Sequence, residues 1–365
     1  MAQPVRVGII GSGFIGSIHA SSVRQCPDAE LVAISSPTPG RAEALAQKHG
    51  APQAFTDYRA MLHLENLDMV IVGAPNHLHC QIALDAAAAG KHVVMEKPMC
   101  LSLAEADRMI AACEAARVKL MYAEELCFAP KYVRMKQLLD SGALGKPTLL
   151  KQSEKHDGPH AEHFWDVDRS GGGVAMDMGC HAIAFFRWLL NGANITSVYA
   201  QMNTQVHGDK TKGEDNAILL LEFENNVVAM AEESWTKTGG MDDRAEIYGS
   251  HGVAYANLLQ GSSIVTYSAE GYDYAVEKAG TTRGWSFTMF EEEWNYGFPQ
   301  EIAHFVDCVQ NDRTPLVTGH DGRAVLEALF AAYASAGQKR KIHLPFQTDA
   351  QKPFDLYNPR IHNPA

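Results

Sequence analysis

The sequence predicts a two-domain α/β protein, in which a doubly wound parallel sheet precedes an α/β domain with a large, open, mainly antiparallel sheet. Three observations support this fold class. The 365 residues suffice for two domains at roughly 100–200 residues each. Residues 1–125 alternate strand-like and helix-like segments, as βαβ units do. From residue 148 onward most strand-like segments follow one another without helices, which indicates antiparallel pairing.

The first domain, residues 1–125, combines short β-branched runs with helix-forming segments. The expected strands are Val5–Ile10, Glu30–Ser35, Asp68–Gly73, Lys91–Met95 and Lys119–Tyr122. The expected helices, rich in Ala, Leu and charged residues, are Phe14–Arg24, Gly40–His49, Leu78–Ala89 and Ser102–Ala116. Ser102 and Glu105 fit a capping box at the start of the last helix.

The second domain, residues 126–345, starts near a predicted helix at Pro130–Ser141, and residues 346–365 form a C-terminal extension. Its expected strands are Thr148–Lys155, Ile195–Val206, Asn216–Phe223, Val227–Trp235, Arg244–Tyr248 and Ile264–Tyr267. Its other expected helices are Val174–Leu190, Phe298–Gln310 and Asp321–Ala336.

Composition excludes several classes of protein. The net charge of −12 argues against a nucleic-acid partner, because such binding relies on clustered Lys and Arg. No apolar stretch approaches the ~20 residues of a membrane-spanning helix. The seven cysteines are scattered and never form a CxxC pair, which is typical of reduced thiols. The N-terminus lacks the pattern of a signal peptide, so we expect a cytoplasmic protein.

A GxGxxG motif lies directly after the first predicted strand and opens the first helix. Glycine at these positions permits a tight turn and a close approach of the backbone to a pyrophosphate, whose charge the helix N-terminus favours. The motif therefore predicts a dinucleotide site. Its residues are Gly11, Gly13, Phe14, Ile15 and Gly16.

The segment after the second strand leaves the choice of cofactor open. An acidic residue about 20 positions after the glycines normally binds the adenosine ribose. This chain has Ser35, Ser36 and Thr38 there, with Arg41 nearby. The hydroxyl groups suit the ribose of NAD, whereas the missing carboxylate and Arg41 also admit NADP.

A Glu96-Lys97-Pro98 turn follows the fourth strand, at the edge where α/β sheets bind ligands. A lysine at this edge can exchange a proton with a substrate hydroxyl once its pKa is lowered. The same tripeptide is also common at a solvated strand end. The sequence therefore makes Lys97 a candidate catalytic residue.

Asp177 and His181 are four residues apart on one predicted helix, after the glycines of Gly171–Gly173. A carboxylate one turn from an imidazole can orient it and raise its basicity, as proton abstraction from an alcohol requires. The alternative is that His181 is a buried core histidine, because Ala184 and Phe185 continue its face of the helix.

These signals together resemble the Gfo/Idh/MocA family of oxidoreductases along nearly the whole chain. Supporting segments are Ala74-Pro75-Asn76-His77-Leu78-His79, Glu96-Lys97-Pro98, the Gly-Gly-Gly-x3-Asp-x3-His pattern, and Gly319–Gly322 leading into Ala331–Ala336. The resemblance implies a Rossmann domain followed by an α/β domain with an open sheet, and a dimer or tetramer that covers the exposed sheet face. It also implies that Lys97, Asp177 and His181 act at the reacting hydroxyl. The residues implied at the nicotinamide end are Pro75, Asn76 and His79. Ala74, Glu96 and Lys97 are further candidate cofactor-binding residues.

One departure from the family leaves the substrate class open. Members often carry an Asn-Arg pair after the fifth strand, whereas this chain has Glu124 and Glu125. The substrate is therefore expected only to be sugar-like, and Glu125 is a candidate substrate-binding residue.

A segment rich in His and acids, residues 156–166, follows the first strand of the second domain. We expect a substrate loop with His156, His160, His163 and Trp165. The alternative, a divalent metal site, is weaker because the spacing matches no zinc signature, so we predict no metal. Arg283 and Trp285 complete the candidates, as an anion clamp and a sugar platform or as ordinary surface charge and core packing.

The sequence thus predicts an NAD(P)-dependent oxidoreductase that transfers a hydride between nicotinamide and a ring hydroxyl of a sugar, sugar acid or cyclitol. His181 would take the hydroxyl proton with help from Lys97, and Asp177 would orient His181. The alternative is a redox-neutral NAD-dependent glycosidase, in which a keto-sugar intermediate undergoes elimination and re-reduction. A sensor without catalytic activity is the third possibility.

Overall fold

The computed structural model describes residues 3–259, 264–270, 280–288 and 292–357. The chain forms two compact units. Unit 1 comprises Met1–Glu125 and Gly297–Leu326, and unit 2 comprises Leu126–Tyr296 and Glu327–Ala365. No helix in the described part of the chain combines the length and the apolar character that a bilayer crossing requires.

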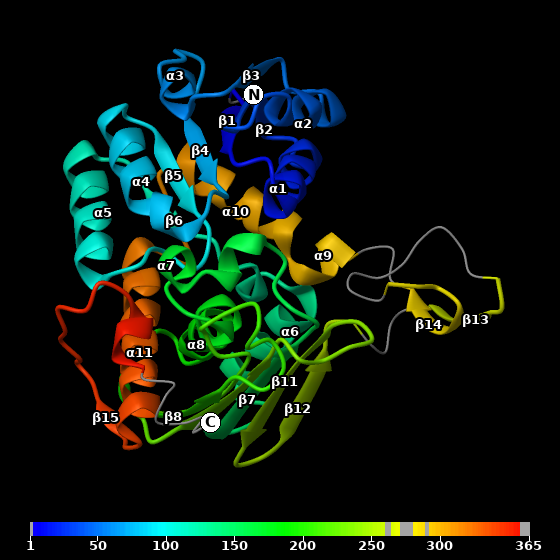
Figure 1. The fold of residues 1–365 in the computed structure, drawn as a ribbon, viewed down its shortest axis with the longest axis vertical. Coiled ribbons are helices and arrows are strands. Elements are labelled where there is room, and N and C mark those ends of the chain that lie inside the picture. The colour runs from blue at the N-terminus through cyan, green and yellow to red at the C-terminus, as the bar shows by residue number, and fades with distance from the viewer. Residues whose placement is uncertain (1–2, 260–263, 271–279, 289–291, 358–365) are drawn as a thin grey trace. The chain divides into compact units, whose positions relative to one another are not determined.

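Unit 1 contains a six-stranded parallel sheet with the strand order β3-β2-β1-β4-β5-β6 (Figure 1). The strands are β1 (Val5–Ile10), β2 (Ala29–Ser35), β3 (Gln53–Phe55), β4 (Met69–Val72), β5 (His92–Met95) and β6 (Leu120–Tyr122). The order reverses between β1 and β4, and ligands of doubly wound sheets bind at such a switch point. The predicted Rossmann sheet is confirmed, and β3 is a strand that the sequence analysis missed.

Helices α1 to α5 alternate with these strands. They are α1 (Phe14–Gln25), α2 (Arg41–His49), α3 (Tyr58–Leu62), the 3-10 turn η1 (Asn76–Leu78) with α4 (His79–Ala88), and α5 (Leu103–Ala116). The capping box of α5 is present, because Ser102 accepts from the backbone of Glu105 and Glu105 accepts from that of Ser102. Local sequence therefore defines this helix start, as expected.

Residues 297–326 group with unit 1, although the sequence analysis placed them in the second domain, 126–345. Helix α10 (Phe298–Gln310) packs against α1, where the rings of Phe298 and His19 meet edge to face at 6.1 Å. Lys119 pairs with Asp312 at 2.8 Å, and Thr318 forms a β-bridge with Met121. The spacing of apolar residues predicts the helix Phe298–Gln310, but it does not determine which sheet the apolar face of this helix covers.

Unit 2 contains a seven-stranded sheet with the order β12-β11-β7-β10-β9-β8-β15. Its strands are β7 (Pro147–Lys155), β8 (Ile195–Asn203), β9 (Asn216–Phe223), β10 (Val228–Ser234), β11 (Asp242–Gly249), β12 (Val253–Asn257) and β15 (Ile342–His343). Only the β7–β10 pair is parallel among these seven. The predicted, mainly antiparallel sheet is therefore confirmed.

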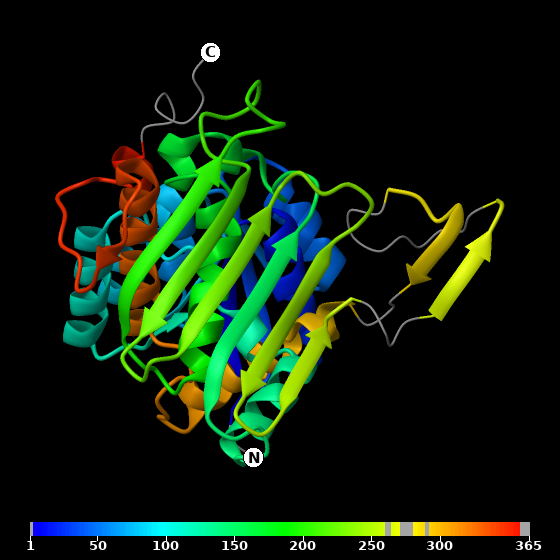
Figure 2. The same cartoon turned by 90° about the horizontal axis from the view of Figure 1, so that it is seen from below.

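The sheet of unit 2 has one covered and one open face (Figure 2). Along β9, Leu219 and Leu221 are buried, whereas Ile218 and Leu220 are 47% and 40% exposed. The two faces alternate because successive side chains of a strand point to opposite sides. A separate two-stranded sheet pairs β13 (Ile264–Ser268) with β14 (Gly284–Thr288) in antiparallel fashion.

The helices of unit 2 are short, except α11. They are the 3-10 turn η2 (Glu125–Cys127), α6 (Pro130–Asp140), the 3-10 turn η3 (Glu162–Trp165), α7 (Val167–Ser170), the π-helical turn η4 (Ala175–Gly179), α8 (Cys180–Leu189), α9 (Glu292–Tyr296), residues 327–338 of α11 (Gly319–Gln338), and the 3-10 turn η5 (Pro353–Leu356). The predicted continuous helix Val174–Leu190 is thus a π-helical turn followed by an α-helix. The described part of the C-terminal extension packs on this unit, where Tyr357 Oη donates to Met202 O at 3.2 Å.

Candidate functional site

The glycine-rich turn of unit 1 is shaped for a dinucleotide. Gly11 has φ 119°, and a Cβ there would lie 2.4 Å from Gly73 O. A Cβ on Gly16 would lie 2.2 Å from Gly11 O, so both glycines are required by the tight turn. A Cβ on Gly13 would meet no described atom within 4 Å. Gly13 thus leaves open space at the N-terminus of α1, where a pyrophosphate would bind.

The segment after β2 presents hydroxyl groups and one cation. Ser35 and Ser36 are buried, and Ser12 Oγ donates to Ser36 Oγ at 2.8 Å. Thr38 and Arg41 are exposed and remain accessible to a ribose or its phosphate. Of the predicted pyrophosphate residues, Phe14 is exposed, and the side chain of Ile15 lies close to Gly73.

The loop after β4 is tied to the loop after β5 by His79. Its Nε2 lies 2.7 Å from Ala74 O, and its Nδ1 lies 3.2 Å from the carbonyl oxygens of both Pro98 and Met99. Burial lowers the pKa of His79, against the raising effect of its contacts with the backbone of Ala74, Met99 and Pro98. Asn76 is buried in η1, the 3-10 turn directly before His79. His79 therefore orders the loops that carry the Glu96-Lys97 turn and Asn76.

The Glu96-Lys97 turn is held by a buried pair. His19 Nε2 lies 2.6 Å from Glu96 Oε1, and Glu96 Oε2 accepts from Lys97 N at 3.0 Å. Lys97 itself is half-buried. Both oxygens of Glu96 are thus used within the protein, which fixes the backbone from which Lys97 projects.

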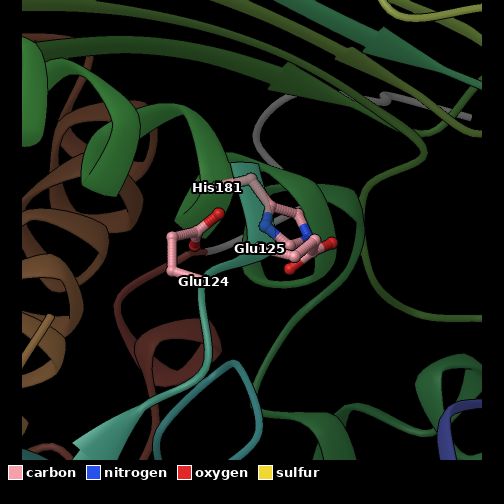
Figure 3. A group of neighbouring side chains, drawn as sticks. All are labelled: Glu124, Glu125 and His181. Atoms are coloured by element: carbon pink, nitrogen blue, oxygen red, sulfur yellow. The ribbon is translucent and has the colours of Figure 1, made fainter. Parts of the chain in front are cut away.

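Buried acids gather beyond β6 in unit 1. Glu124 and Glu125, drawn in Figure 3, follow this strand, and Glu301 Oε1 on α10 accepts from Glu124 N at 2.7 Å. Burial, followed by the charges of Glu125, Glu96 and Glu124, raises the pKa of Glu301 well above its usual range. Glu301 therefore favours its protonated form. Glu301 was not predicted from the sequence, in which it is one of two acids in the otherwise largely apolar helix of residues 298–310.

The candidate acid and base of unit 2 lie on η4 and α8. Asp177 and His181 are 3% and 2% exposed, and His181 is drawn in Figure 3. Trp235 Nε1 donates to Asp177 Oδ2 at 3.0 Å. Because η4 is π-helical, the one-turn spacing assumed for a continuous α-helix does not apply to Asp177. That Asp177 orients His181 stays a prediction, whereas Trp235 is a contact of Asp177 that the sequence did not reveal.

The three consecutive glycines are needed by the packing around η4. Gly171, with φ 91°, ends α7. A Cβ on Gly172 would lie 2.0 Å from Tyr333 Oη, and a Cβ on Gly173 would lie 2.0 Å from Glu214 O. Tyr333 and Glu214 therefore define where η4 begins. Neither was predicted, although Tyr333 lies inside the Ala331–Ala336 motif.

The histidine-rich loop after β7 forms an aromatic group with Trp235. His156 is buried with Nδ1 2.6 Å from Gly158 O, and its ring lies 4.5 Å from that of His160. Trp165 contacts Trp235 at a centroid distance of 5.3 Å. In the described part of the chain, this segment contributes no group of three converging ligand atoms, so the alternative of a metal site there gains no support.

The remaining candidates have other contacts. His163 is half-buried, and its ring lies 4.5 Å from that of Phe164 at a tilt of 33°. Arg283 is exposed, and its Nε donates to Glu270 O at 3.1 Å. The side chain of Trp285 lies outside the described residues. The roles predicted for Arg283 and Trp285 therefore stay predictions.

Two family models match this sequence in order along the chain. The model described as oxidoreductase family, NAD-binding Rossmann fold, matches residues 5–124, and the GFO/IDH/MocA C-terminal domain model matches residues 132–255. The chain belongs to the Gfo/Idh/MocA family. It is an NAD-dependent oxidoreductase, and the predictions of family, fold class and NAD as cofactor are confirmed.

Similar proteins cover nearly the full length of this Gfo/Idh/MocA chain. The myo-inositol 2-dehydrogenase of Thermotoga maritima is 29% identical over 93% of this chain and 98% of its own. The scyllo-inositol 2-dehydrogenase (NAD(+)) of Bacillus subtilis is 29% identical over 97% and 99%. The crystal structure of GenD2 from gentamicin A biosynthesis in complex with NAD is 29% identical over 95% and 98%, with a TM-score of 0.89.

Proposed function

We propose that this enzyme oxidises a ring hydroxyl of a sugar, sugar acid or cyclitol and passes the hydride to NAD. The observation that carries the proposal is the buried Asp177, held by Trp235 on a π-helical turn that leads directly into the helix of His181. π-helical turns are frequent at functional sites. Two similar proteins are named inositol 2-dehydrogenases, which supports a cyclic polyol as the substrate.

The residues divide the work between cofactor binding and proton transfer. The open space at Gly13 and the N-terminus of α1 suit the pyrophosphate, and the hydroxyl-rich segment after β2 suits the ribose. NAD supplies the hydride acceptor when bound. His181 takes the hydroxyl proton as the C–H electron pair leaves, and Lys97 assists this proton transfer.

The buried acids of unit 1 determine which charge of substrate we expect. Glu96, Glu124, Glu125 and Glu301 are all buried at the carboxyl end of the parallel sheet. A carboxylate or sulfonate brought to this edge would be repelled by like charge, whereas a neutral or amino-substituted ring would not. We therefore expect neutral or amino-substituted rings to be better substrates than uronates.

A substrate panel tests the proposal. Inositols, hexoses, amino sugars, uronates, sulfonated sugars and aryl glycosides are incubated with NAD or NADP, while NADH absorbance and aglycone release are both followed. NADH formation with a ketone product supports the dehydrogenase. Aglycone release without net NADH indicates the glycosidase instead.

Two variants assign the activity to the predicted residues. Lys97→Ala and His181→Ala should abolish NADH formation, whereas the exposed Lys146→Ala and His320→Ala serve as matched controls. Turnover that survives in both active-site variants would show that the proposed roles are wrong.

We also propose that the open face of the sheet pairs with a further copy of the chain as a homodimer or homotetramer. One register row across this face contains Tyr255, Glu246, Lys151, Met230, Leu220 and Tyr199. The apolar side chains of this row are more stable when buried in a protein interface than when exposed to water. Leu220→Lys should lower the solution mass in light scattering, whereas Val206→Lys, at an exposed site outside the sheet, should not.

A further inference from the structure

The π-helical turn η4 begins on a buried carboxylate that the proposed chemistry does not use. Glu214 is fully buried, and its Oε1 accepts from Ala175 N at 2.9 Å. Its Oε2 accepts from Gly173 N at 3.3 Å, and its backbone oxygen accepts from Val174 N at 2.9 Å. One residue therefore binds three successive N–H groups at the entry to η4, where a helix has no acceptors of its own.

Tyr333 completes this arrangement from α11. Its hydroxyl donates to Glu214 Oε1 at 2.5 Å and accepts from Gly173 N at 3.0 Å. Gly173 in turn connects the pair to Asp177, because Gly173 O accepts from Asp177 N at 3.2 Å. The contacts of Glu214 are thus only one peptide group away from the backbone of Asp177.

The charge of Glu214 decides how many of these contacts can form together. An ionised carboxylate has only acceptor sites and can serve Ala175 N, Gly173 N and Tyr333 Oη at once. A protonated carboxyl must donate its own hydrogen, which the N–H groups of Gly173 and Ala175 cannot accept. The Tyr333 hydroxyl can accept it only by giving up its own donation to Glu214 Oε1. Protonation therefore removes or reverses at least one hydrogen bond at the entry to η4.

We propose that Glu214 is a positioning residue, whose ionised carboxylate, together with Tyr333, holds the turn that carries Asp177 in the form that supports turnover. This inference rests on the proposed dehydrogenase function. Glu214 acts through the backbone of Gly173 and Ala175 and is not assigned any contact with substrate or cofactor.

The ionisation of Glu214 falls near neutral pH. Burial raises the pKa of Glu214 to about 7, against the lowering effect of the hydrogen bonds from Tyr333, Ala175 and Gly173. Four titratable groups surround it: Tyr333 on α11, Tyr357 in the C-terminal segment, Asp215 next in sequence and Asp177 on η4. Burial raises the pKa of both tyrosines, and hydrogen bonds from His207, Val206 and Gln205 lower that of Asp215 although burial opposes them. Both tyrosines therefore stay neutral near pH 7, and Asp215 stays ionised.

The test compares kcat against pH for the full-length enzyme and three variants. Wild-type kcat should rise through an apparent pKa near 7. Glu214→Gln should lose the part of this dependence that Glu214 contributes, leaving the part set by the proposed base His181. It should also turn over about tenfold more slowly at pH 8, because the amide cannot accept from Gly173 N as a carboxylate oxygen does. Tyr333→Phe removes a hydrogen bond that lowers the pKa of Glu214, so its transition should move to higher pH. Glu224→Gln, at an exposed site, should behave as wild type.

Thermal unfolding gives a readout that does not need activity. Because the folded pKa lies above the ordinary value of 4.5, folding binds protons between about 4.5 and 7, and the wild-type Tm should fall across this range relative to Glu214→Gln. If Glu214→Gln does not fold, Tyr333→Phe carries the test. Unchanged kcat transitions in the variants, or parallel Tm curves, would overturn this inference while leaving the dehydrogenase intact. Absence of wild-type turnover on the whole substrate panel would instead reject the proposed function.

Discussion

The two units hold their candidate functional groups by different means. In unit 1, the glycines of the cofactor turn fall within six consecutive residues, and Glu96 fixes the backbone of its own neighbour Lys97. In unit 2, Asp177 is bound by Trp235, which is 58 residues away, and Gly173 is bound by Tyr333, which is 160 residues away. A short motif therefore specifies the geometry of the cofactor turn in unit 1, although Glu96 is also held by His19, 77 residues away. In unit 2 the motif specifies only which residues are present.

The largest effect should come from the proposed base in unit 2. His181→Asn removes the group that takes the substrate proton, so we expect kcat to fall about 10²- to 10⁴-fold. Binding of NAD, measured by calorimetry, should stay unchanged because the glycine turn belongs to unit 1. A kcat within a factor of three of the wild-type value would show that His181 is a buried core histidine and not the base.

The next effect separates two glycines of the same turn. Gly13→Ala should weaken NAD binding about tenfold or more without loss of stability, because its Cβ enters open space that the pyrophosphate would use. Gly11→Ala should also lower the free energy of unfolding, by about 1–3 kcal/mol, because of its positive φ and its contact with Gly73 O. Calorimetry measures NAD binding, and denaturant unfolding measures the free energy of unfolding. Equal destabilisation by Gly13→Ala and Gly11→Ala would contradict the different roles given to the two glycines.

A smaller effect tests the long-range support of unit 2. Trp235→Phe keeps an aromatic ring but removes the donor to Asp177 Oδ2, so we expect kcat to fall about tenfold, as for a lost hydrogen bond to a charged group. KM should change less than kcat, since the variant alters the position of Asp177 and not the whole pocket. Phe354→Leu, a half-buried aromatic change elsewhere in the same unit, is the control.

The smallest effect concerns the pH dependence of stability in unit 1. The raised pKa of Glu301 means that the folded state binds a proton that the unfolded state releases above about pH 4.3. The free energy of unfolding should therefore decline more in wild type than in Glu301→Gln as pH rises from 5 to 9. Denaturant unfolding at the two pH values measures this difference, and identical declines would show that Glu301 is already ionised at pH 5.

Local patterns predicted most elements of both units. The strand β1 and the helix α10 have the bounds expected from the sequence, and Ser102 with Glu105 forms the expected capping box. The short strand β3 was missed because three residues carry too little periodicity. Among candidate site residues, the motifs proposed the glycine turn, Lys97, Asp177 and His181, and these roles stay predictions. The motifs did not point to Trp235, Glu214, Tyr333 or Glu301, whose contacts the structure shows.

What the sequence by itself determined was the order of elements, the cofactor turn and the identity of the chemical groups, because steric limits at glycine and side-chain periodicity act over a few residues. Only the tertiary structure decided that residues 297–326 join unit 1, and that a carboxylate and a phenol distant in sequence support η4. Residues 297–326 join unit 1 because their apolar helix face is buried there, and η4 is supported because its buried N–H groups need acceptors. In both cases the contacting residues are distant in sequence, so local patterns could not identify them.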